Sequence, residues 1–565
     1  MHRPGRRIAW AAESPEDPLG VAAAAAAGSG WKGSDGARSP RSSSSTEEEE
    51  EKGAKGATPE REAEAGDEGE QPLLRGIFGV GKRSCDVVLS AQRLSWSPIQ
   101  PERPVGASSV GLTNEEEYVE MEDVFSVKLK RRRFVGQQKG GLLLGITVFV
   151  CLKKEGNKLK DSVINLSNLS EDHCYLWFKR LKEILNGFPN RPKSLKVFVN
   201  PNSHRKEASR IYHEQVAPLF KLADIKADVT VTEYEGHALE LLKECDLTSF
   251  HGVVCIGGDG TAHEVAHGLL LRAQMDARRD GDDIIAPVRA QVPLGIIPAG
   301  STNILAYTVN GIQHTVTATL HIIMGHVQSV DVCTFSSPTK LLRFGFSSMF
   351  GFGSRALALA EKHRWMPSSQ RKDFAVLKTL ASLKPEYCEL SFLPLEQDAQ
   401  EEDKKQQKRL KSDSRDHWRR IQGHFLNVSI MAIPCLCSMA PRGLAPNTRL
   451  DDGSIALIVV RNTSRSEFVR HLKRYASVKN QFNFPFVEAF IVEEVKVQSR
   501  TRKEHITRDN LNSIDPEEKN YPWNIDGDLM EWPSDVCVRV HPRLINLYGK
   551  SVDAVDNPKG SCSCL

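Results

Sequence analysis

A short apolar run that ends in a glycine-rich turn constrains the fold of this chain more than any other segment. Residues 253–256 are all apolar, and Gly257, Gly258, Asp259 and Gly260 follow them directly. The run predicts a buried parallel strand, and apolar residues at helical spacing behind the turn predict a helix. Glycines at such a junction adopt backbone angles closed to other residues and let a ligand approach the main chain. The segment therefore predicts a strand–turn–helix unit that holds Asp259 where α/β sheets bind ligands.

Two more strand patterns end in turns of similar chemistry. Residues 194–199 form an apolar strand pattern that breaks at Asn200 and Pro201, and residues 294–298 run into a Gly-Ser-Thr-Asn turn at 300–303. Three strands that end in these three turns resemble the catalytic domain of the diacylglycerol kinase superfamily, which also contains the sphingosine and ceramide kinases.

Later segments support this resemblance, because they occur in the order expected for the superfamily. They are residues 442–446, 451–453 and 523–528. The resemblance covers most of residues 73–550 and is closest to the ceramide kinases. It implies phosphoryl transfer from a nucleotide to the primary hydroxyl of a lipid, a reaction that depends on positioning and charge neutralisation.

A separate pattern precedes the kinase-like segment. Short strand patterns between residues 75 and 152 lead into a helical pattern that places Cys174, Trp177, Phe178 and Leu181 on one face. Strands closed by one C-terminal helix with a tryptophan resemble a pleckstrin-homology domain, which ceramide kinases carry at this place. The residues by themselves predict a small β-barrel with a capping helix.

A basic cluster lies within this first domain. Residues 125–130 alternate strictly, which predicts that apolar side chains face the core while Ser126 and the lysines face outward. Three interpretations remain open: a solvated strand edge, a phosphoinositide headgroup site that Lys82 and Arg83 would complete, or a nuclear-import sequence. The cluster consists of Lys128, Lys130, Arg131, Arg132 and Arg133.

Length predicts a protein of several domains, and composition predicts an intracellular location. A chain of 565 residues is too long for one core, and a net charge of +3 points to no charged partner. Twelve scattered cysteines predict a reducing compartment, and no run of eighteen apolar residues occurs. We expect a disordered tail over 1–72, a pleckstrin-homology-like domain over 73–190, a diacylglycerol-kinase-type α/β catalytic domain over 191–338, a β-rich second lobe over 339–550 with disordered insertions near 397–416 and 498–519, and a tail over 551–565.

The resemblance assigns roles to individual residues. It implies that Asp259 accepts the proton of the lipid hydroxyl, and that Gly257, Gly258 and Gly260 let the substrate approach. It implies ATP with Mg²⁺ as the phosphoryl donor, and no dedicated protein metal site. The implied nucleotide-binding residues are Asn200, Pro201, Asn202, Thr232, Glu233, Tyr234, Glu235, Gly236, Glu264, Ser301, Thr302, Asn303, Asp526, Gly527 and Asp528.

Three departures from the superfamily pattern stand out. The loop over residues 203–208 contains no glycine where ceramide kinases have several, and side chains there disfavour positive φ and keep the backbone away from a phosphate. Arg355 stands where sphingolipid kinases have a substrate-binding aspartate, so an acceptor has become a donor. Its helix is more simply interpreted as a packing helix. Asp528 is a shorter replacement for a glutamate.

These departures leave two functions open. The first is a diverged ceramide-kinase-like protein with weak or absent ceramide phosphorylation, acting through lipid, nucleotide or protein binding in sphingolipid-related regulation. The alternative is an active ATP-dependent kinase for another lipid, with Arg205 and Lys206 on the phosphates. An NAD-kinase-like enzyme, which shares the Gly-Gly-Asp-Gly turn, is disfavoured by the pleckstrin-homology-like segment.

Partners and location follow from the first domain. We expect membrane lipids or phosphoinositides and the nuclear import machinery as partners, no nucleic acid, and a cytoplasmic and nuclear protein with peripheral membrane association. Cys435 and Cys437 are interpreted as buried thiols rather than metal ligands. Cys562 formally fits a prenylation box, but a chance match is the favoured interpretation, because the residues between are not aliphatic and no polybasic stretch precedes them.

Overall fold

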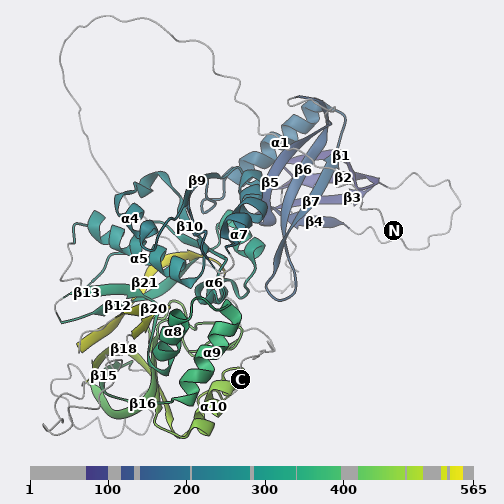
Figure 1. Ribbon diagram of the computed structural model, residues 1–565. Helices are drawn as coiled ribbons and strands as arrows, with labels where there is room; N and C mark the ends of the chain where they lie inside the picture. Colours follow the sequence, from purple (N-terminus) through teal and green to yellow (C-terminus); the bar gives the residue numbers. More distant parts are fainter. Residues whose placement is uncertain are drawn as a thin grey trace, which may run out of the picture.

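The computed structural model has three successive parts that follow the chain order (Figure 1). It describes residues 71–99, 116–132, 140–203, 206–279, 286–338, 340–395, 418–477, 480–499, 523–530 and 535–550. Arg133, Arg205, Cys562 and the segment 397–416 lie outside these ranges, as do the tails before residue 71 and after residue 550. The other expected insertion, 498–519, begins inside a strand that ends at Ser499, and its remainder is not described.

The first part is a seven-stranded antiparallel sheet capped by one helix, as expected for a pleckstrin-homology domain. The strand order is β4-β3-β2-β1-β7-β6-β5. Helix α1 begins after Ser170, whose hydroxyl accepts the N–H of His173, and it buries Trp177 completely in the barrel core. The elements are β1 (Leu74–Val80), β2 (Arg83–Leu89), β3 (Arg93–Pro98), β4 (Glu117–Glu120), η1 (Met121–Asp123), β5 (Val124–Arg132), β6 (Leu142–Lys153), β7 (Leu159–Ser167) and α1 (Glu171–Asn186).

The second part is an α/β unit with a parallel sheet. Strands β9, β8, β10 and β11 pair in parallel in this order, and every residue of β10 is buried, as its continuous apolar run predicts. The elements are β8 (Ser194–Val199), α2 (Ala208–Ile211), η2 (Tyr212–Val216), α3 (Ala217–Leu222), β9 (Lys226–Val231), α4 (His237–Glu244), η3 (Leu247–Ser249), β10 (Gly252–Gly257), α5 (Asp259–Asp276), β11 (Leu294–Pro298), α6 (Ile304–Asn310), α7 (Thr315–Met324) and β12 (Val327–Ser336).

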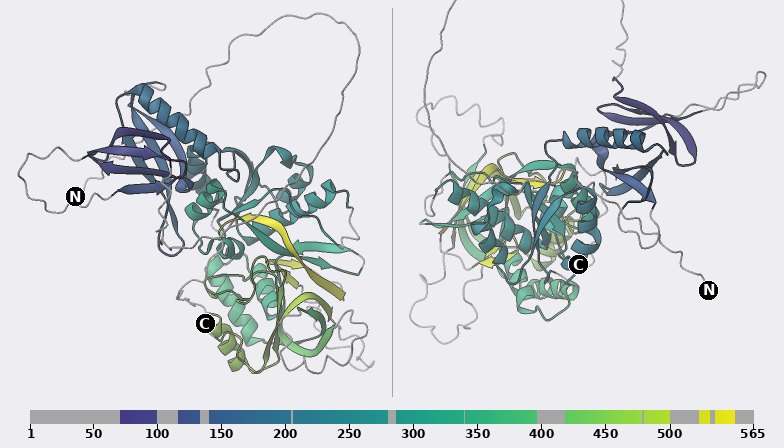
Figure 2. Two further views of the ribbon diagram at one scale, coloured as in Figure 1. Left: turned by 180° about the vertical axis from the view of Figure 1, so that it is seen from behind. Right: turned by 90° about the horizontal axis from the view of Figure 1, so that it is seen from above.

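The third part is a β-rich lobe whose last strand returns to the second part. Strand β21 pairs with β11, β12 and β18, so it joins both lobes in one continuous sheet (yellow in Figures 1 and 2). The elements are β13 (Leu341–Gly345), β14 (Ser347–Gly351), α8 (Phe352–Lys362), α9 (Ser368–Ala381), β15 (Glu386–Pro394), β16 (Arg419–Met431), β17 (Ile455–Arg461), α10 (Arg465–Arg474), β18 (Val487–Ser499), β19 (Trp523–Ile525), β20 (Asp528–Met530) and β21 (Asp535–Tyr548).

The pleckstrin-homology-like domain packs directly on the α/β unit. One hydrophobic cluster contains Phe125 and Cys151 from the barrel together with Leu219 and Phe220 from α3. The Leu159 N–H also donates to the Thr317 hydroxyl at 2.9 Å. The two domains therefore share a core rather than only a linker.

This interface corrects one expectation about the basic strand. Ser126 and Lys128 point away from the barrel core as predicted, but they do not face solvent: their exposed fractions are 1% and 4%. The Ser126 hydroxyl donates to the Leu222 carbonyl, and the Lys128 ammonium pairs with Asp224, which also binds Lys182 at 2.5 Å. Alternation sets which face of a strand is the barrel interior, but it does not show what covers the other face.

The Lys128–Asp224 pair affects its two partners unequally. Burial lowers the pKa of Lys128, which is almost fully enclosed. Burial alone would raise the pKa of Asp224, but the hydrogen bonds from Lys128 and Lys182 outweigh it, and the pKa lies below its ordinary value. The interface thus holds Asp224 as a carboxylate.

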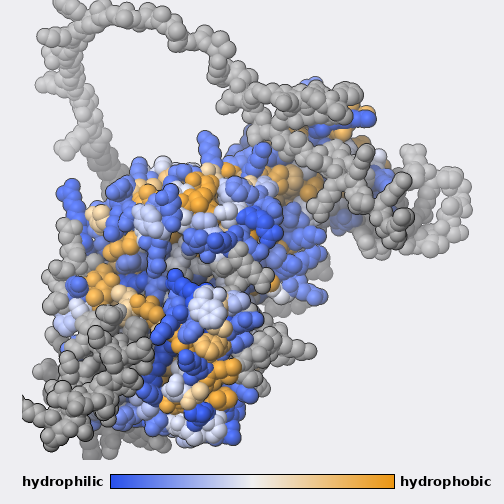
Figure 3. Space-filling view, viewed as in Figure 1, coloured by the Kyte–Doolittle hydropathy of each residue, from blue (hydrophilic) through white to orange (hydrophobic). Residues whose placement is uncertain are grey.

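Within the described ranges, no helix is long and apolar enough to cross a membrane. On the face drawn in Figure 3, apolar residues form separate patches among hydrophilic ones.

Candidate functional site at the strand ends

Two glycine turns pack backbone against backbone at the carboxyl ends of β10 and β11. A β-carbon on Gly300 would lie 2.4 Å from Cα of Gly258, and one on Gly257 would lie 2.6 Å from the Thr261 hydroxyl oxygen. Asn303, at φ +53°, closes the second turn by exchanging side-chain hydrogen bonds with both backbone groups of Gly300. Gly258 and Gly300 are required for the approach of the two turns, and Gly257 for the packing of Thr261, whether or not a ligand binds.

Gly260 differs from its neighbours. A β-carbon there would meet only the Asp528 carboxylate within 4 Å, at 3.9 Å, and the residue is exposed. Of the three glycines assigned to substrate approach, Gly260 is therefore the one with open space before it. Ser301 is exposed in the neighbouring turn.

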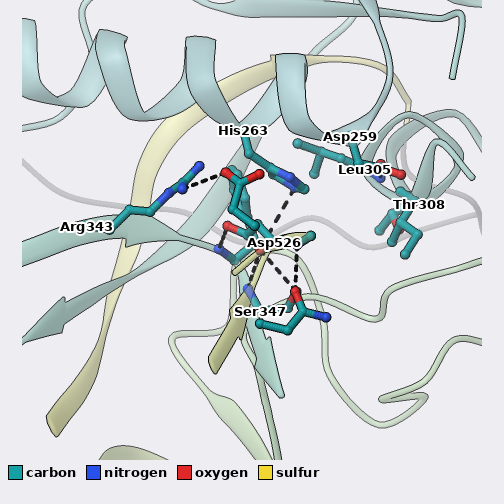
Figure 4. A network of polar contacts seen from close by, with 12 residues as sticks. Asp259, His263, Leu305, Thr308, Arg343, Ser347 and Asp526 are labelled. Carbon is teal, nitrogen blue, oxygen red and sulfur yellow. Dashed lines mark hydrogen bonds and ion pairs between the residues drawn. The ribbon is translucent and has the colours of Figure 1, made fainter. Parts of the chain in front are cut away.

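The Asp259 carboxylate holds the first turn of α6, the helix that follows β11. Asp259 is the first residue of α5, and its Oδ1 accepts the Leu305 N–H of α6 at 3.3 Å (Figure 4). Burial raises the pKa of Asp259 above its ordinary value, while His263, the N–H groups of Leu305 and Ile304, and Lys372 oppose that rise. The residue that resembles a catalytic base thus also caps a helix.

Glu264 has an equivalent structural task on the other side of α5. Its carboxylate accepts the Leu239 N–H at 3.2 Å at the start of α4. Burial raises its pKa, and hydrogen bonds from Leu239, Gly236 and Ala238 oppose the rise. The Asn200 side chain also makes hydrogen bonds within the protein. Its Nδ2 donates to the Thr261 hydroxyl at 2.8 Å, and its Oδ1 accepts the Asn202 N–H at 3.0 Å.

Asp526 clamps the bend between β13 and β14. Its carboxylate accepts the backbone N–H of Phe346 at 2.9 Å and both the N–H and the hydroxyl of Ser347, at 2.7 Å and 3.0 Å. The side chain is almost fully buried, and His263 Nε2 lies 3.9 Å from it (Figure 4). Gly527, at φ +91°, makes the turn to Asp528, whose carboxylate pairs with Arg343 at 2.6 Å.

The segment 232–236 lies at the start of α4. Thr232 is buried, while Glu233, Tyr234 and Glu235 are exposed. Tyr234 stacks on His237 with ring centroids 4.7 Å apart and donates to Glu240 at 2.6 Å. Gly236 takes φ +92° as the cap of α4, so its flexibility is needed by the turn itself.

The loop after β8 turns in on itself. The Ser203 N–H donates to the Asn200 carbonyl at 3.2 Å, and the Lys206 N–H donates to the Ser203 carbonyl at 2.9 Å. Side chains disfavour positive φ here, yet one described residue of the loop, Lys206, adopts φ +61°. The loop therefore contains a residue in the left-handed conformation, but the N–H groups of Asn202, Ser203 and Lys206 donate to acceptors in the same loop rather than pointing at a ligand site.

Comparisons with known proteins agree with this arrangement. Three family models match successive segments: the ceramide kinase PH domain (74–181), the diacylglycerol kinase catalytic domain (194–335) and the ceramide kinase C-terminal domain (346–565). The Homo sapiens ceramide kinase-like protein is 61% identical over 510 residues, covering 86% of this chain and 91% of that protein. Homo sapiens ceramide kinase is 31% identical over 538 residues, covering 87% and 99%.

The chain belongs to the ceramide kinase family. The resemblance inferred from the turns, and the fold of a pleckstrin-homology-like domain, a diacylglycerol-kinase-type catalytic domain and a β-rich second lobe, are confirmed. Among solved structures, a diacylglycerol kinase from Bacillus anthracis str. Sterne is 15% identical, with a TM-score of 0.39, and the match covers 64% of this chain and 97% of that one.

Arg355, which stands where the resemblance places a substrate-binding aspartate, packs inside the protein. It is almost fully buried on α8, and its guanidinium binds the Lys384 carbonyl and the Glu386 carboxylate. Its charge is neutralised inside the second lobe. The expected packing interpretation of this helix agrees with these contacts.

The carboxylates do not form a ready-made site for Mg²⁺ with ATP. Asp526 binds backbone N–H groups, Asp528 binds Arg343, Glu264 holds α4 and Asp259 holds α6. Within the described ranges, no three His, Cys, Asp or Glu side chains cluster as metal ligands. Cys435 and Cys437 are both buried, and burial raises the pKa of Cys437.

Two residues near Asp259 escaped sequence reasoning. His263 lies one helical turn beyond Asp259 and is 6% exposed, and its buried Nδ1 has no hydrogen-bond partner among the residues that the structure describes. Lys372 on α9 donates from Nζ to the Thr302 hydroxyl at 2.6 Å. The i, i+4 spacing from Asp259 could have indicated His263. Nothing local could have indicated Lys372, because it comes from the other lobe.

Proposed function

We propose that this chain is a diverged member of the ceramide kinase family that phosphorylates ceramide weakly or not at all. It acts through binding of lipid, nucleotide or protein in sphingolipid-related regulation. The observation that carries the proposal is the loop after β8, where the amides of Ser203 and Lys206 donate to carbonyls of the same loop. A phosphate-binding loop needs its amides directed at the ligand.

One observation favours the alternative, an active ATP-dependent kinase for another lipid. Asp259 remains at the end of β10, and burial raises its pKa, which makes the carboxylate a stronger base than an exposed one. Its bond to Leu305 is long, at 3.3 Å, so a substrate hydroxyl could compete for the carboxylate.

A turnover assay separates the two functions. The purified full chain would be incubated with labelled ATP, Mg²⁺ and a panel of ceramides, sphingoid bases and diacylglycerols, beside Asp259→Asn and a control, Asp228→Asn, at an exposed ion pair with Lys196. We expect no product above the Asp259→Asn background. Product that disappears with Asp259→Asn but persists with Asp228→Asn would establish the alternative.

We also propose peripheral membrane association through the first domain. Lys128 is enclosed by the catalytic domain, and among the described residues of the basic cluster Arg132 is the exposed one. Leu142 pairs with Arg132 across β5 and β6 and is 60% exposed, and Leu169 at the start of α1 is 83% exposed. Exposed leucines beside an arginine suit an anionic lipid surface.

Sedimentation with vesicles tests the membrane proposal. We expect binding to vesicles that contain phosphatidylserine or phosphoinositides, weaker binding to neutral vesicles, and loss of binding in the pair Leu142→Asp and Leu169→Asp. Met275→Asp, at a 48% exposed position on α5, is the matched control. Equal binding of all variants would remove this surface from the proposal.

The location in cytoplasm and nucleus remains part of the proposal. Import receptors bind extended peptides, whereas the described cluster residues lie in strand β5, with Arg131 bound to the Tyr175 hydroxyl. Import through this segment would therefore require β5 to leave its sheet. A fluorescent fusion in which Lys130, Arg131 and Arg132 are replaced by alanine should stay cytoplasmic if the cluster acts in import.

A further inference from the structure

Strand β9 is an open edge of the large sheet. It stands at one end of the strand order, and among the strands that the structure describes it pairs only with β8. The Lys226 N–H donates to the Lys193 carbonyl, and the Thr232 N–H donates to the Val199 carbonyl, both at 2.9 Å. The even-numbered residues of β9 therefore direct their backbone groups at β8. The odd-numbered residues direct theirs away from the sheet, because the backbone groups of a strand alternate between its two sides.

All three residues that direct backbone groups outward are apolar. They are Ala227, Val229 and Val231, and the two valines are 37% and 50% exposed. Their side chains share one face of the sheet, since alternate residues of a strand point the same way. Ala227 packs on that face against the cluster that contains Leu195 and Val197 of β8. The apolar face of the sheet thus continues from the core to the open edge.

This edge lacks the usual features that prevent strand pairing. Proteins blunt such edges with proline, with bulges or with charged side chains. Strand β9 contains no proline and pairs with β8 without a register shift. Its two charged residues, Lys226 and Asp228, alternate with the apolar ones and so point to the other face of the sheet. Unpaired main-chain donors and acceptors beside an apolar face fit another β-strand.

One register of self-pairing uses the whole edge. Two copies of β9 that pair antiparallel about Val229 place Val229 opposite its own copy and Ala227 opposite Val231. All six of these residues are then in hydrogen-bonded pairs, because each directs its N–H and C=O outward. The valines of both copies also form one apolar strip across the seam.

The charges tolerate this register. On the other face of the paired strands, Asp228 lies opposite Thr230 and Lys226 lies opposite Thr232, so no charge directly faces its like. The two Asp228 carboxylates are diagonal neighbours, but each is already paired with its own Lys196 at 2.9 Å. The edge is therefore complementary to itself in backbone groups, in apolar side chains and in charge.

We infer that β9 is a dimerisation edge, at which a second copy of this chain adds its own β9 antiparallel with the twofold axis at Val229. Self-complementarity of one surface patch is what a twofold interface requires, so the partner is a second copy rather than an unrelated peptide. The seam joins strands of only six residues. Because such an interface is small, the dimer is weak and forms at micromolar concentrations.

Sedimentation velocity of the full chain tests the dimer. We expect the wild type to move from one chain of 62.8 kDa toward two chains between about 1 and 100 μM. Val229→Lys and Val229→Asp should each stay monomeric, because like charges would meet at the axis. An equimolar mixture of these two variants should dimerise again, which misfolded variants could not do. Val163→Lys, at a 47% exposed strand position of the first domain, is the control and should dimerise like the wild type.

Cysteine cross-linking tests the register. Directly opposed residues of an antiparallel pair have Cα atoms about 5.5 Å apart, which a disulfide can bridge. Treated with diamide, which takes up the two protons and two electrons of the thiols, Val229→Cys should form a covalent dimer that dithiothreitol cleaves. Val231→Cys is the matched control on the same face, because its two copies would lie roughly 14 Å apart. The wild type, with its twelve cysteines, sets the background.

Three results would overturn the inference. They are a wild type that stays monomeric at about 100 μM, a mixture of the charged variants that stays monomeric, and equal cross-linking of Val229→Cys and Val231→Cys. A dimer that Val163→Lys also abolishes would place the contact on the first domain and overturn it as well. The inference does not depend on the proposed function, so lipid turnover by the chain would leave it unchanged.

Discussion

The turn after β10 and the loop after β8 meet the same edge of one sheet, yet they have diverged to different degrees. The first keeps all its glycines, and two of them are held by packing: Gly258 lies against Gly300, and Gly257 against Thr261. The second has no glycine over 203–208, and its exposed Lys206 adopts the left-handed conformation instead. A motif that the protein needs for its own packing is retained whether or not it catalyses.

The same reasoning applies to the acidic residues. Asp259, Glu264 and Asp526 each accept backbone N–H groups of another element. Their presence is therefore weak evidence for phosphoryl transfer, because the same side chains would hold these N–H groups in a catalytically silent protein. Four experiments on stability can break or sharpen this comparison.

The largest effect is expected at Asp526. Replacement by alanine leaves the N–H groups of Phe346 and Ser347 buried without an acceptor, and we expect a loss of about 3 kcal/mol in the free energy of unfolding, measured in urea. Asp528→Ala is the matched control, because its pair with Arg343 is partly exposed, and it should cost about 1 kcal/mol or less. Equal effects would show that Asp526 is not a clamp.

The second-largest loss in the free energy of unfolding is expected for Gly300→Ala. Its β-carbon would overlap Cα of Gly258, at 2.4 Å, and we expect about 2 kcal/mol of destabilisation from overpacking. Gly260→Ala is the control within the same pair of turns, where the space is open and α5 begins. It should stabilise the protein by about 0.5 kcal/mol, since alanine favours a helix over glycine. If Gly300→Ala left the free energy of unfolding unchanged, packing would not explain why this turn has a glycine.

Asp259 should show an effect that depends on pH. Asp259→Ala loses the contact with Leu305 and should cost about 1 kcal/mol, whereas Asp259→Asn keeps an acceptor. The folded-state pKa is raised, so the folded protein binds more protons than the unfolded chain between the ordinary and the raised value. Wild-type stability therefore falls as pH rises through that window.

The measurement for Asp259 is urea unfolding from pH 4 to pH 8. Asp259→Asn should be more stable than the wild type at pH 7, and the difference should shrink on acidification. A difference that is constant across this range would show that burial does not penalise the carboxylate.

The smallest effect is expected at Lys206. Its φ of +61° is unfavourable for a residue with a β-carbon, so Lys206→Gly should be neutral or stabilising by roughly 0.5 kcal/mol in thermal unfolding. Lys221→Gly, within the short helix α3, should instead destabilise by about 1 kcal/mol. Destabilisation at both positions would show that the loop is not strained.

Much of the fold could be predicted because its signals are local. The apolar run of β10, the glycines behind it and the helical face with Trp177 each predict an element from a few neighbouring residues. The family motifs then placed the domains in order. The outward face of β5 was predicted as solvent-exposed, because alternation carries no information about a neighbouring domain.

The site was harder to predict because its contacts are long-range. Asp526 binds the N–H of Phe346, 180 positions away, and Lys372 reaches Thr302 across 70. A residue type at a motif position predicts the chemistry that its side chain can perform, such as accepting a proton or a hydrogen bond.

By itself the sequence determined the three-part architecture, the glycine turns and the position of Asp259 at a strand end, since periodicity and turn chemistry act over short distances. Only the tertiary structure decided that Lys128 is buried, that Lys372 joins the strand ends and that the acidic residues hold backbone N–H groups. Which partner a charge finds depends on how distant segments pack, and packing is a property of the whole fold.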